Sequence, residues 1–293
     1  MEKVVMQFMR RRGKPLGGQR ILITGAARGI GAATAERLAA SGARVALAGL
    51  EPELLGEVAA RCGDAAWWTC DVADRSQVVS VVSEVVEAFG GLDVVMANAG
   101  IVAVDPLVGG DPATWDRTVA VNLGGVYNTI HAAGPHISHA NGYLLAVASL
   151  GAALHAPLSG AYCATKAAIE AVGNVLRQEL RPSGARVGVA YFGEVATDMV
   201  SRTMDSEAAR YLTRDGGIWP YNAVTPLQSA VDHIERGIAR RSRRVVAPSY
   251  ISPALPLRMG LQRFADVALA SRVARSVEIA RSETPAFTTE QPQ

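Results

Sequence analysis

The 293-residue chain has little cysteine, little net charge and few long apolar runs. Its three cysteines, Cys62, Cys70 and Cys163, show neither CxxC nor metal-ligand spacing, so we expect no disulfide framework and no metal centre. A reducing cytoplasm is the simplest setting. No apolar run is long enough to cross a bilayer. A net charge of +2 provides no general attraction for phosphate, which argues against a nucleic-acid partner.

Residues 1–18 form a basic segment, in which a short apolar patch precedes Arg10, Arg11, Arg12 and Lys14. A signal peptide would have its basic residues before a longer apolar region and would end in small residues. We therefore interpret residues 1–18 as a frayed basic extension. A peripheral contact with a membrane surface is the alternative interpretation.

The rest of the chain alternates short apolar runs with stretches of helical periodicity. Strands are expected at 20–24, 44–48, 65–69, 92–97, 143–148, 186–191 and 244–247. Helices are expected at about 30–41, 52–61, 75–89, 112–138, 160–181 and 226–240. This alternation predicts an α/β fold with a doubly wound parallel sheet of about seven strands and helices on both faces. Residues 19–250 would form this domain.

Two segments depart from the alternation. Residues 197–226 are long and place apolar side chains among polar ones, and they follow a strand end where ligands are expected, so we interpret them as a lid rather than a surface insertion. These apolar side chains are Met199, Met204, Tyr211, Leu212, Trp219 and Tyr221. Residues 251–293 would form a tail, with an amphipathic helix on the stripe Leu257, Leu261, Phe264 and Ala268 and with disorder from Ser282 onward.

A glycine-rich turn follows the first expected strand in "TGAARGIG", with Gly25, Gly29 and Gly31 before a helix. Glycines let backbone N–H groups approach a pyrophosphate, and a helix N-terminus favours negative charge. The spacing TGxxxGxG differs from the general GxGxxG fingerprint. An ordinary strand-to-helix turn is the alternative, but the position in a βαβ unit favours a dinucleotide site.

Four polar residues follow the later strands in a pattern that predicts acid–base chemistry. Tyr162 and Lys166 are four residues apart and share one helix face. An ammonium about 4 Å from a phenol would lower the tyrosine pKa by about three units, toward neutral pH. Ser149 could stabilise charge on a substrate oxygen, and Asn122 could hold a water in a proton relay. A packed tyrosine, a solvated lysine and a structural asparagine are the alternatives.

Together these features resemble the short-chain dehydrogenase/reductase family. The resemblance rests on "TGAARGIG", "CDVAD", "NAG", "VNLGGVYN", Ser149 and "YCATK", in the family's order over residues 20–197. It implies a Rossmann-like domain and reversible hydride transfer between an NAD or NADP cofactor and an alcohol or ketone. It also implies that Tyr162 is the general acid/base, that Lys166 lowers its pKa and binds the nicotinamide ribose, and that Ser149 and Asn122 assist.

The same resemblance implies the residues of the cofactor site. Asp71 would bind the adenine, Asn98 the neighbouring cofactor backbone and Thr197 the nicotinamide carboxamide. The full set expected at the cofactor is Gly25, Ala27, Arg28, Gly29, Ile30, Gly31, Gly49, Leu50, Glu51, Asp71, Val72, Asn98, Ala99, Gly100, Tyr162, Lys166, Gly193, Val195 and Thr197.

The chain departs from the family at two places. Phe192-Gly193-Glu194 stands where the family usually has Pro-Gly, and the C-terminal region lacks the Gly-Gly ending of many tetramers. We therefore expect a homodimer through the helices near 112–138 and 160–181, with a tetramer as the alternative. The residues expected at the substrate are Leu150, Leu154, His155, Phe192 and Glu194, which favour a hydrophobic, steroid-like or long-chain alcohol or ketone.

The choice between NAD and NADP depends on the end of the second strand. Gly49 stands where NAD-preferring relatives carry an acid, and Arg28 is placed to face a phosphate, so the sequence marginally favours NADP. Glu51, two residues later, could replace the missing acid. Two other functions stay open on this fold: a non-catalytic nucleotide sensor, and a dehydratase or epimerase that retains its cofactor.

Overall fold

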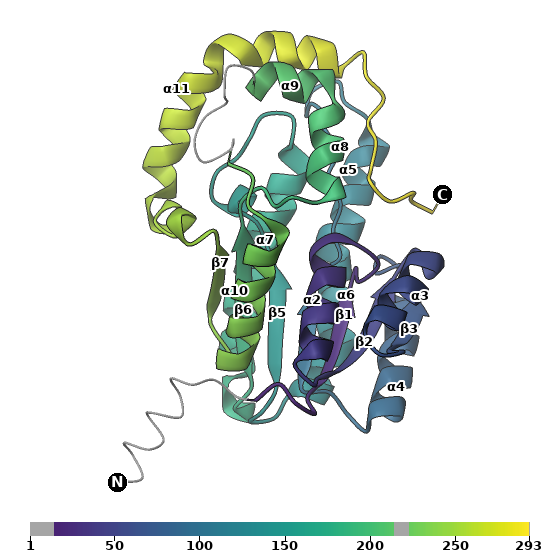
Figure 1. The fold of residues 1–293 in the computed structure, drawn as a ribbon. Coiled ribbons are helices and arrows are strands. Elements are labelled where there is room, and N and C mark those ends of the chain that lie inside the picture. The colour runs from purple at the N-terminus through teal and green to yellow at the C-terminus, as the bar shows by residue number, and fades with distance from the viewer. Residues whose placement is uncertain (1–14, 214–222, 293) are drawn as a thin grey trace.

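The centre of the protein is a seven-stranded parallel sheet. The structure, a computed structural model, describes residues 15–213 and 223–292. The strand order is β3-β2-β1-β4-β5-β6-β7 (Figure 1). The strands are β1 (Arg20–Thr24), β2 (Arg44–Gly49), β3 (Ala66–Thr69), β4 (Val94–Ala97), β5 (Tyr143–Val147), β6 (Arg186–Phe192) and β7 (Arg244–Ala247). The predicted doubly wound sheet is confirmed. Its order changes direction between β1 and β4, which opens a crevice at their carboxyl ends.

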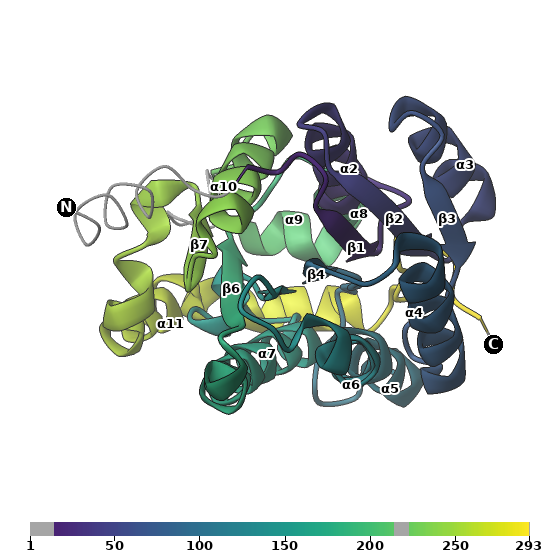
Figure 2. The same cartoon turned by 90° about the horizontal axis from the view of Figure 1, so that it is seen from below.

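Helices cover both faces of the sheet (Figure 2). One layer contains α2 (Gly29–Ala40), α3 (Pro52–Arg61) and α10 (Leu227–Arg240). The other contains α4 (Arg75–Phe89), α5 (Pro112–Val119), α6 (Gly125–Ile137) and α7 (Gly160–Glu179). Each layer packs an apolar core against its face of the sheet. This explains why β4 and β5 are buried throughout and why β1, β2 and β6 are buried after their first residue.

The helix expected at 112–138 is divided in the structure. A π-helical turn, Ala120–Gly124, separates α5 from α6 and contains Asn122. Such turns insert one extra residue into a helix and are frequent at functional sites. The periodicity of the sequence therefore predicted the helical segment correctly but gave no indication of the interruption.

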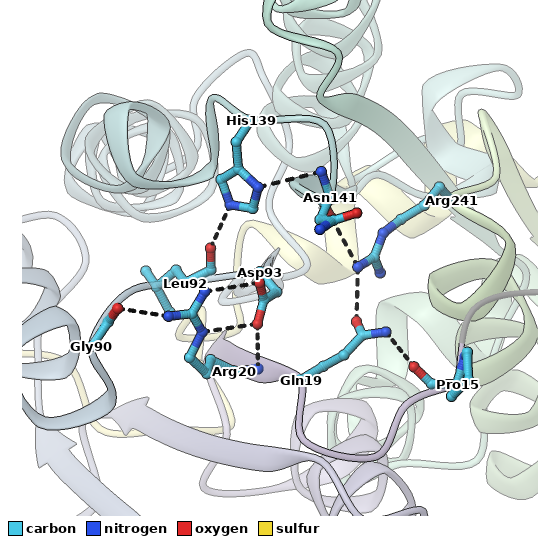
Figure 3. A network of polar contacts seen from close by, with 9 residues as sticks. All are labelled: Pro15, Gln19, Arg20, Gly90, Leu92, Asp93, His139, Asn141 and Arg241. Atoms are coloured by element: carbon cyan, nitrogen blue, oxygen red, sulfur yellow. Dashed lines mark hydrogen bonds and ion pairs between the residues drawn. The ribbon is translucent and has the colours of Figure 1, made fainter.

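A network of polar contacts lies at the amino-terminal edge of the sheet, where the strands begin (Figure 3). Arg20, at the start of β1, pairs with Asp93 just before β4, with an Nε–Oδ2 distance of 2.9 Å. Arg241, which ends α10, donates to the Gln19 side chain at 2.8 Å and to the Asn141 carbonyl at 3.0 Å. These contacts tie together the segments that enter β1, β4, β5 and β7, while the carboxyl edge carries the cavity described below.

The chain after β6 builds a cover over this carboxyl edge. Helices α8 (Asp198–Asp205) and α9 (Glu207–Thr213) contain the first part of the expected lid, whereas Trp219 and Tyr221 lie outside the described residues. The 27-residue α11 (Ala254–Ala280) arches over the top and packs on α9 (Figure 1). Within the described residues, no helix has the length and apolar character needed to cross a membrane.

The C-terminal tail beyond α11 continues along the domain. Residues from Ser282 onward, expected to be disordered, are described as far as Pro292. The Glu283 carboxylate accepts hydrogen bonds from Ser206 Oγ at 2.7 Å and from the Glu207 backbone N–H at 2.6 Å. From there the tail descends past α8 toward α3 (Figure 1).

Candidate active site

A cavity of about 200 Å³ lies at the carboxyl ends of the central strands. Its walls come from the glycine turn, the ends of β2 and β4, the start of α7, the segment after β6 and the C-terminal tail. All of the residues expected at the cofactor line it except Gly31. The structure thus brings together residues that are more than 150 positions apart in the sequence.

The glycine turn has the backbone that its sequence predicts. Gly25 and Gly29 adopt positive φ angles of 65° and 56°, a region that L side chains rarely enter. A Cβ at Gly25 would lie 2.7 Å from the Cα of Ala99, and a Cβ at Gly31 would overlap the Gly25 carbonyl oxygen. Gly31 therefore serves close packing beneath the turn rather than the cavity wall.

Helix α2 presents its N-terminus to the cavity. Its N-cap residue, Arg28, makes no side-chain cap hydrogen bond within the described structure, and the first turn contains no acid. The free N–H groups of that turn, together with Gly29 and Ile30 on the cavity wall, fit the negative charge of a pyrophosphate.

Asn98 fixes the glycine turn from the neighbouring strand. Its side-chain amide donates to the carbonyl oxygens of Thr24 at 3.0 Å and Gly25 at 3.1 Å, and its backbone N–H donates to Thr24 Oγ1 at 3.1 Å. These bonds satisfy the Thr24 and Gly25 carbonyl oxygens and the Thr24 hydroxyl on the side of the turn that faces β4. Asn98 thus positions the turn in addition to lining the cavity.

Glu51 and Arg28 form an ion pair on the cavity wall near the end of β2. Arg28 Nε donates to Glu51 Oε2 at 2.9 Å, and Arg28 Nη1 donates to Asp198 Oδ2 at 3.0 Å. The hydrogen bond with Glu51 contributes most to raising the pKa of Arg28. A single arginine therefore joins the glycine turn both to Glu51, two residues after β2, and to the first residue of α8.

The catalytic candidates Ser149, Tyr162 and Lys166 lie together in the cavity, away from the Glu51–Arg28 ion pair. Tyr162 and Ser149 form a side-chain hydrogen bond, and Lys166 Nζ lies 5.5 Å from the centre of the Tyr162 ring. Lys166 is 4% exposed, and its ammonium donates to the Val147 carbonyl at 2.9 Å. The predicted grouping of serine, tyrosine and lysine is present in the structure.

Burial sets the protonation of this group. It raises the pKa of Tyr162 to about 12, an effect that the hydrogen bond with Ser149 partly offsets, and it lowers the pKa of Lys166 to about 8. The direction for Tyr162 is opposite to the one expected from the sequence. The attraction between an ammonium and a phenolate would lower the Tyr162 pKa, but the cost of removing both charges from water exceeds it.

Asn122 lies beneath the catalytic group. Its Oδ1 accepts from the Ile101 backbone N–H at 2.7 Å, and its Nδ2 donates to the Ile101 carbonyl at 2.9 Å and to Thr165 Oγ1 at 3.1 Å. These contacts engage both ends of the amide. The side chain therefore holds the segment after β4 against α7, and a water relay would depend on the backbone of the π-helical turn.

The residues expected at the substrate separate into three locations. Phe192 lines the cavity near Ser149. Leu150 and Leu154 pack instead with Ile251 and Ala254 in a small core cluster below α11. The His155 backbone exchanges hydrogen bonds of 2.7 and 3.1 Å with the Gln262 side chain on α11, so it faces a groove outside the cavity.

Glu194 lies one residue beyond the cavity-lining Gly193 and is half-buried. Its backbone carbonyl accepts from the Thr225 N–H at 2.7 Å, which joins the segments on either side of the lid. Burial raises the pKa of its carboxyl group to about 7. Glu194 thus lies at the base of the lid.

Met199, expected in the lid, lines the cavity together with its neighbour Val200 of α8. The sequence did not indicate that Thr288, Thr289 and Gln291 of the tail would form another part of the wall. Arg117 of α5, a further residue missed, donates to Asp71 Oδ2 at 2.9 Å. The helical period placed Arg117 on α5, but only the fold shows that it faces Asp71.

Comparisons with known proteins identify the family of this chain. The family described as short chain dehydrogenase matches residues 19–208. The short-chain dehydrogenase/reductase eriH of Hericium erinaceus is 36% identical over 211 residues, which cover 67% of this chain and 84% of the relative. A 2,5-dichloro-2,5-cyclohexadiene-1,4-diol dehydrogenase of Sphingobium indicum is 33% identical over 218 residues, covering 72% of this chain and 84% of the relative.

The fold has counterparts among solved structures. Levodione reductase superposes with a TM-score of 0.71 at 26% sequence identity, covering 78% of this chain and 95% of the other. The chain belongs to the short-chain dehydrogenase/reductase family and is an oxidoreductase of that family.

Proposed function

We propose that this protein is an NAD-dependent dehydrogenase or reductase that interconverts a hydrophobic secondary alcohol and its ketone. The observation that carries the proposal is the placement of Ser149, Tyr162 and Lys166 in one cavity with an uncapped glycine-turn helix. The helix terminus suits a pyrophosphate, and the catalytic group suits proton transfer at a carbonyl oxygen.

The roles of the side chains follow from their contacts. With its pKa raised by burial, Tyr162 is protonated at neutral pH and can donate its proton to a carbonyl oxygen. Ser149 Oγ accepts from the Gly151 N–H at 3.1 Å, which orients its hydroxyl beside the phenol. Lys166 is fixed by the Val147 carbonyl at the base of the cavity. A nicotinamide cofactor, when bound, would exchange a hydride with the substrate carbon.

The ion pairs of Arg28 support NAD over NADP. The sequence marginally favoured NADP because Gly49 lacks the usual acid and Arg28 could face a 2′-phosphate. In the structure Arg28 is engaged by two carboxylates, Glu51 and Asp198, and Glu51 itself lines the cavity. A 2′-phosphate there would meet a carboxylate and an arginine whose charge is already compensated, whereas ribose hydroxyls could donate to Glu51.

The cavity wall supports an apolar substrate. Phe192, Val195, Met199 and Val200 line it on the side of β6 and α8. Apolar walls with a few convergent polar groups are typical of small-molecule sites. The relative named for a cyclohexadiene-diol is consistent with a carbocyclic alcohol of this kind.

The test of this function is a Tyr162→Phe variant, compared with the parent protein against a panel of hydrophobic alcohols and ketones. We expect the variant to bind NADH as the parent does and to lose turnover by roughly 10²-fold or more, because proton transfer by a positioned side chain contributes about this much. Full turnover in Tyr162→Phe would refute the assignment.

The same panel separates the other candidate functions. A parent protein that binds NADH but converts nothing would favour a nucleotide sensor. A nucleotide that co-purifies and never exchanges would favour a dehydratase or epimerase.

For the assembly we propose a homodimer through α5, α6 and α7. Large apolar side chains on these helices are exposed in the single chain: Trp115 is 39% exposed, Tyr127 49% and Val175 57%. Light scattering during size exclusion should give twice the chain mass. A Val175→Lys variant should shift this toward the monomer if α7 lies in the interface.

A further inference from the structure

The C-terminal tail lines the cavity at the end opposite Tyr162. Thr288, Thr289 and Gln291 share this part of the wall with Glu51 and Asp71. Figure 1 shows the tail descending from α11 past α8 to this position near α3. Residues 288–291 thus lie beside the groups expected to bind the adenosine half of the cofactor.

Two tail side chains contact these groups or their partners. Thr289 Oγ1 donates to Glu51 Oε2 at 3.3 Å, the same oxygen that Arg28 Nε contacts. Gln291 Oε1 accepts from Arg117 Nε at 2.9 Å, and Arg117 in turn binds Asp71 at 2.9 Å. The tail therefore reaches the ribose acid directly and the adenine acid through one arginine.

The tail has its own anchors and internal contacts. Phe287 packs against the main core cluster, and Glu283 is held by Ser206 and Glu207 of the lid. Gln291 Nε2 also donates to the Thr289 carbonyl at 2.7 Å, which closes a small loop between the two contact residues. These contacts lower the entropy cost of holding residues 287–291 in place.

The tail leaves the adenosine end of the cavity open beneath it. Gly49, Leu50 and Val72 still line the same cavity together with the tail residues. The segment thus acts as a wall on the solvent side of the cavity rather than as a plug that fills it.

We infer that residues 287–291 form a cofactor-binding strap, in which Thr289 and Gln291 position Glu51 and Arg117 around the adenosine half of NAD. The inference rests on the proposed function, because it assumes a dinucleotide in this cavity. The strap would add affinity for any ligand that contains the adenosine half and would slow its release. It would leave ligands that contain only the nicotinamide half unaffected.

The experiment compares four variants of the full chain: a deletion of residues 286–293, Thr289→Ala, Gln291→Ala and the control Glu290→Ala. Glu290 lies between the two contact residues, and its side chain is exposed. Calorimetry measures Kd for NADH, ADP-ribose and nicotinamide mononucleotide, and stopped-flow fluorescence measures the release of NADH. Thermal unfolding without ligand checks that each variant is folded.

The deletion should raise Kd for NADH and ADP-ribose about tenfold, because Glu51 and Arg117 lose the contacts that position them for the adenosine half. Each of Thr289→Ala and Gln291→Ala should raise it severalfold and speed the release of NADH. Kd for nicotinamide mononucleotide should not change, and Glu290→Ala should match the parent. The point variants retain Phe287, so they stay informative if the deletion does not fold.

Two results would overturn the inference. Unchanged affinity for ADP-ribose in both point variants would show that the tail is a passive cover. Tighter binding after the deletion would show that the tail competes with the cofactor. A parent protein that binds neither NADH nor ADP-ribose would instead refute the proposed function, so the two failures are distinguishable.

Discussion

The burial of Lys166 predicts that a residue expected to serve catalysis reduces the stability of the cofactor-free protein. Lys166 is 4% exposed, and burial lowers its pKa from 10.5 to about 8. A shift of this size corresponds to about 3 kcal/mol of unfavourable free energy for the charged form in the folded state. Replacing the ammonium by an apolar side chain should remove that penalty.

Lys166→Met is the variant that tests this magnitude. Methionine has a similar length, and its loss of the hydrogen bond to the Val147 carbonyl costs about 1 kcal/mol. The net gain in the free energy of unfolding at pH 7 should be about 2 kcal/mol, or roughly 4 °C in Tm. Turnover should be lost in the same variant.

The pH dependence gives the sharper result. Because the pKa of Lys166 is lower in the folded state, the unfolded chain binds more protons between about pH 8 and 10.5. The contribution of Lys166 to stability therefore rises with pH across this window. The advantage of Lys166→Met should be largest at pH 7 and should disappear by about pH 10 in urea denaturation.

Tyr162→Phe is the matched control, since it removes the neighbouring hydroxyl and retains the ammonium. Its stability difference from the parent should show no rise between pH 7 and 9.5. A Lys166→Met variant that is less stable than the parent at pH 7, or a difference that stays constant up to pH 10, would refute the reasoning.

Three further predictions concern stability. Burial raises the Glu194 pKa to about 7, so this carboxyl group reduces the stability of the protein as the pH rises from 4.5 to 7. Glu194→Gln should remove this loss, which is about 1–2 kcal/mol after solvent screening. Urea denaturation across the same pH range measures it. Asp93→Asn should cost about 1 kcal/mol at pH 7 and less below pH 4, since its arginine partner lowers the Asp93 pKa and the contribution vanishes on protonation. Gly31→Ala should lower the free energy of unfolding by about 2 kcal/mol or more, because the new Cβ would overlap the Gly25 carbonyl oxygen. Gly260→Ala is the control, since a Cβ there meets no atom of the described residues. In thermal melts it should be neutral or slightly stabilising.

The residues that sequence reasoning placed correctly are those whose role is set by local backbone chemistry. The positive φ angles of Gly25 and Gly29 follow from the turn between β1 and α2. Tyr162 and Lys166 meet the same cavity because they are one helical turn apart on α7. In both cases a short stretch of chain determines the geometry, so the sequence alone contains the information.

The residues that sequence reasoning misplaced or missed make contacts with residues distant in the sequence. Leu150 and Leu154 follow Ser149 closely, and proximity to a catalytic residue suggested a substrate contact. Their side chains face Ile251 and Ala254, about 100 residues later, because the start of α11 crosses that side of the domain. The tail contact between Thr289 and Glu51 spans 238 positions, and no local pattern predicts it.

The pKa of Tyr162 shows the same limit in energetic terms. A spacing of four residues indicates that an ammonium and a phenol are neighbours, and Coulomb's law then lowers the phenol pKa. Spacing does not indicate how much water surrounds the pair, and in this cavity burial raises the Tyr162 pKa and lowers the Lys166 pKa. At neutral pH the cofactor-free site therefore holds a proton on Tyr162. If the protein reduces a ketone as proposed, this proton is available to the carbonyl oxygen, and the rate of reduction should fall as the pH rises past about 8, where Lys166 loses its charge.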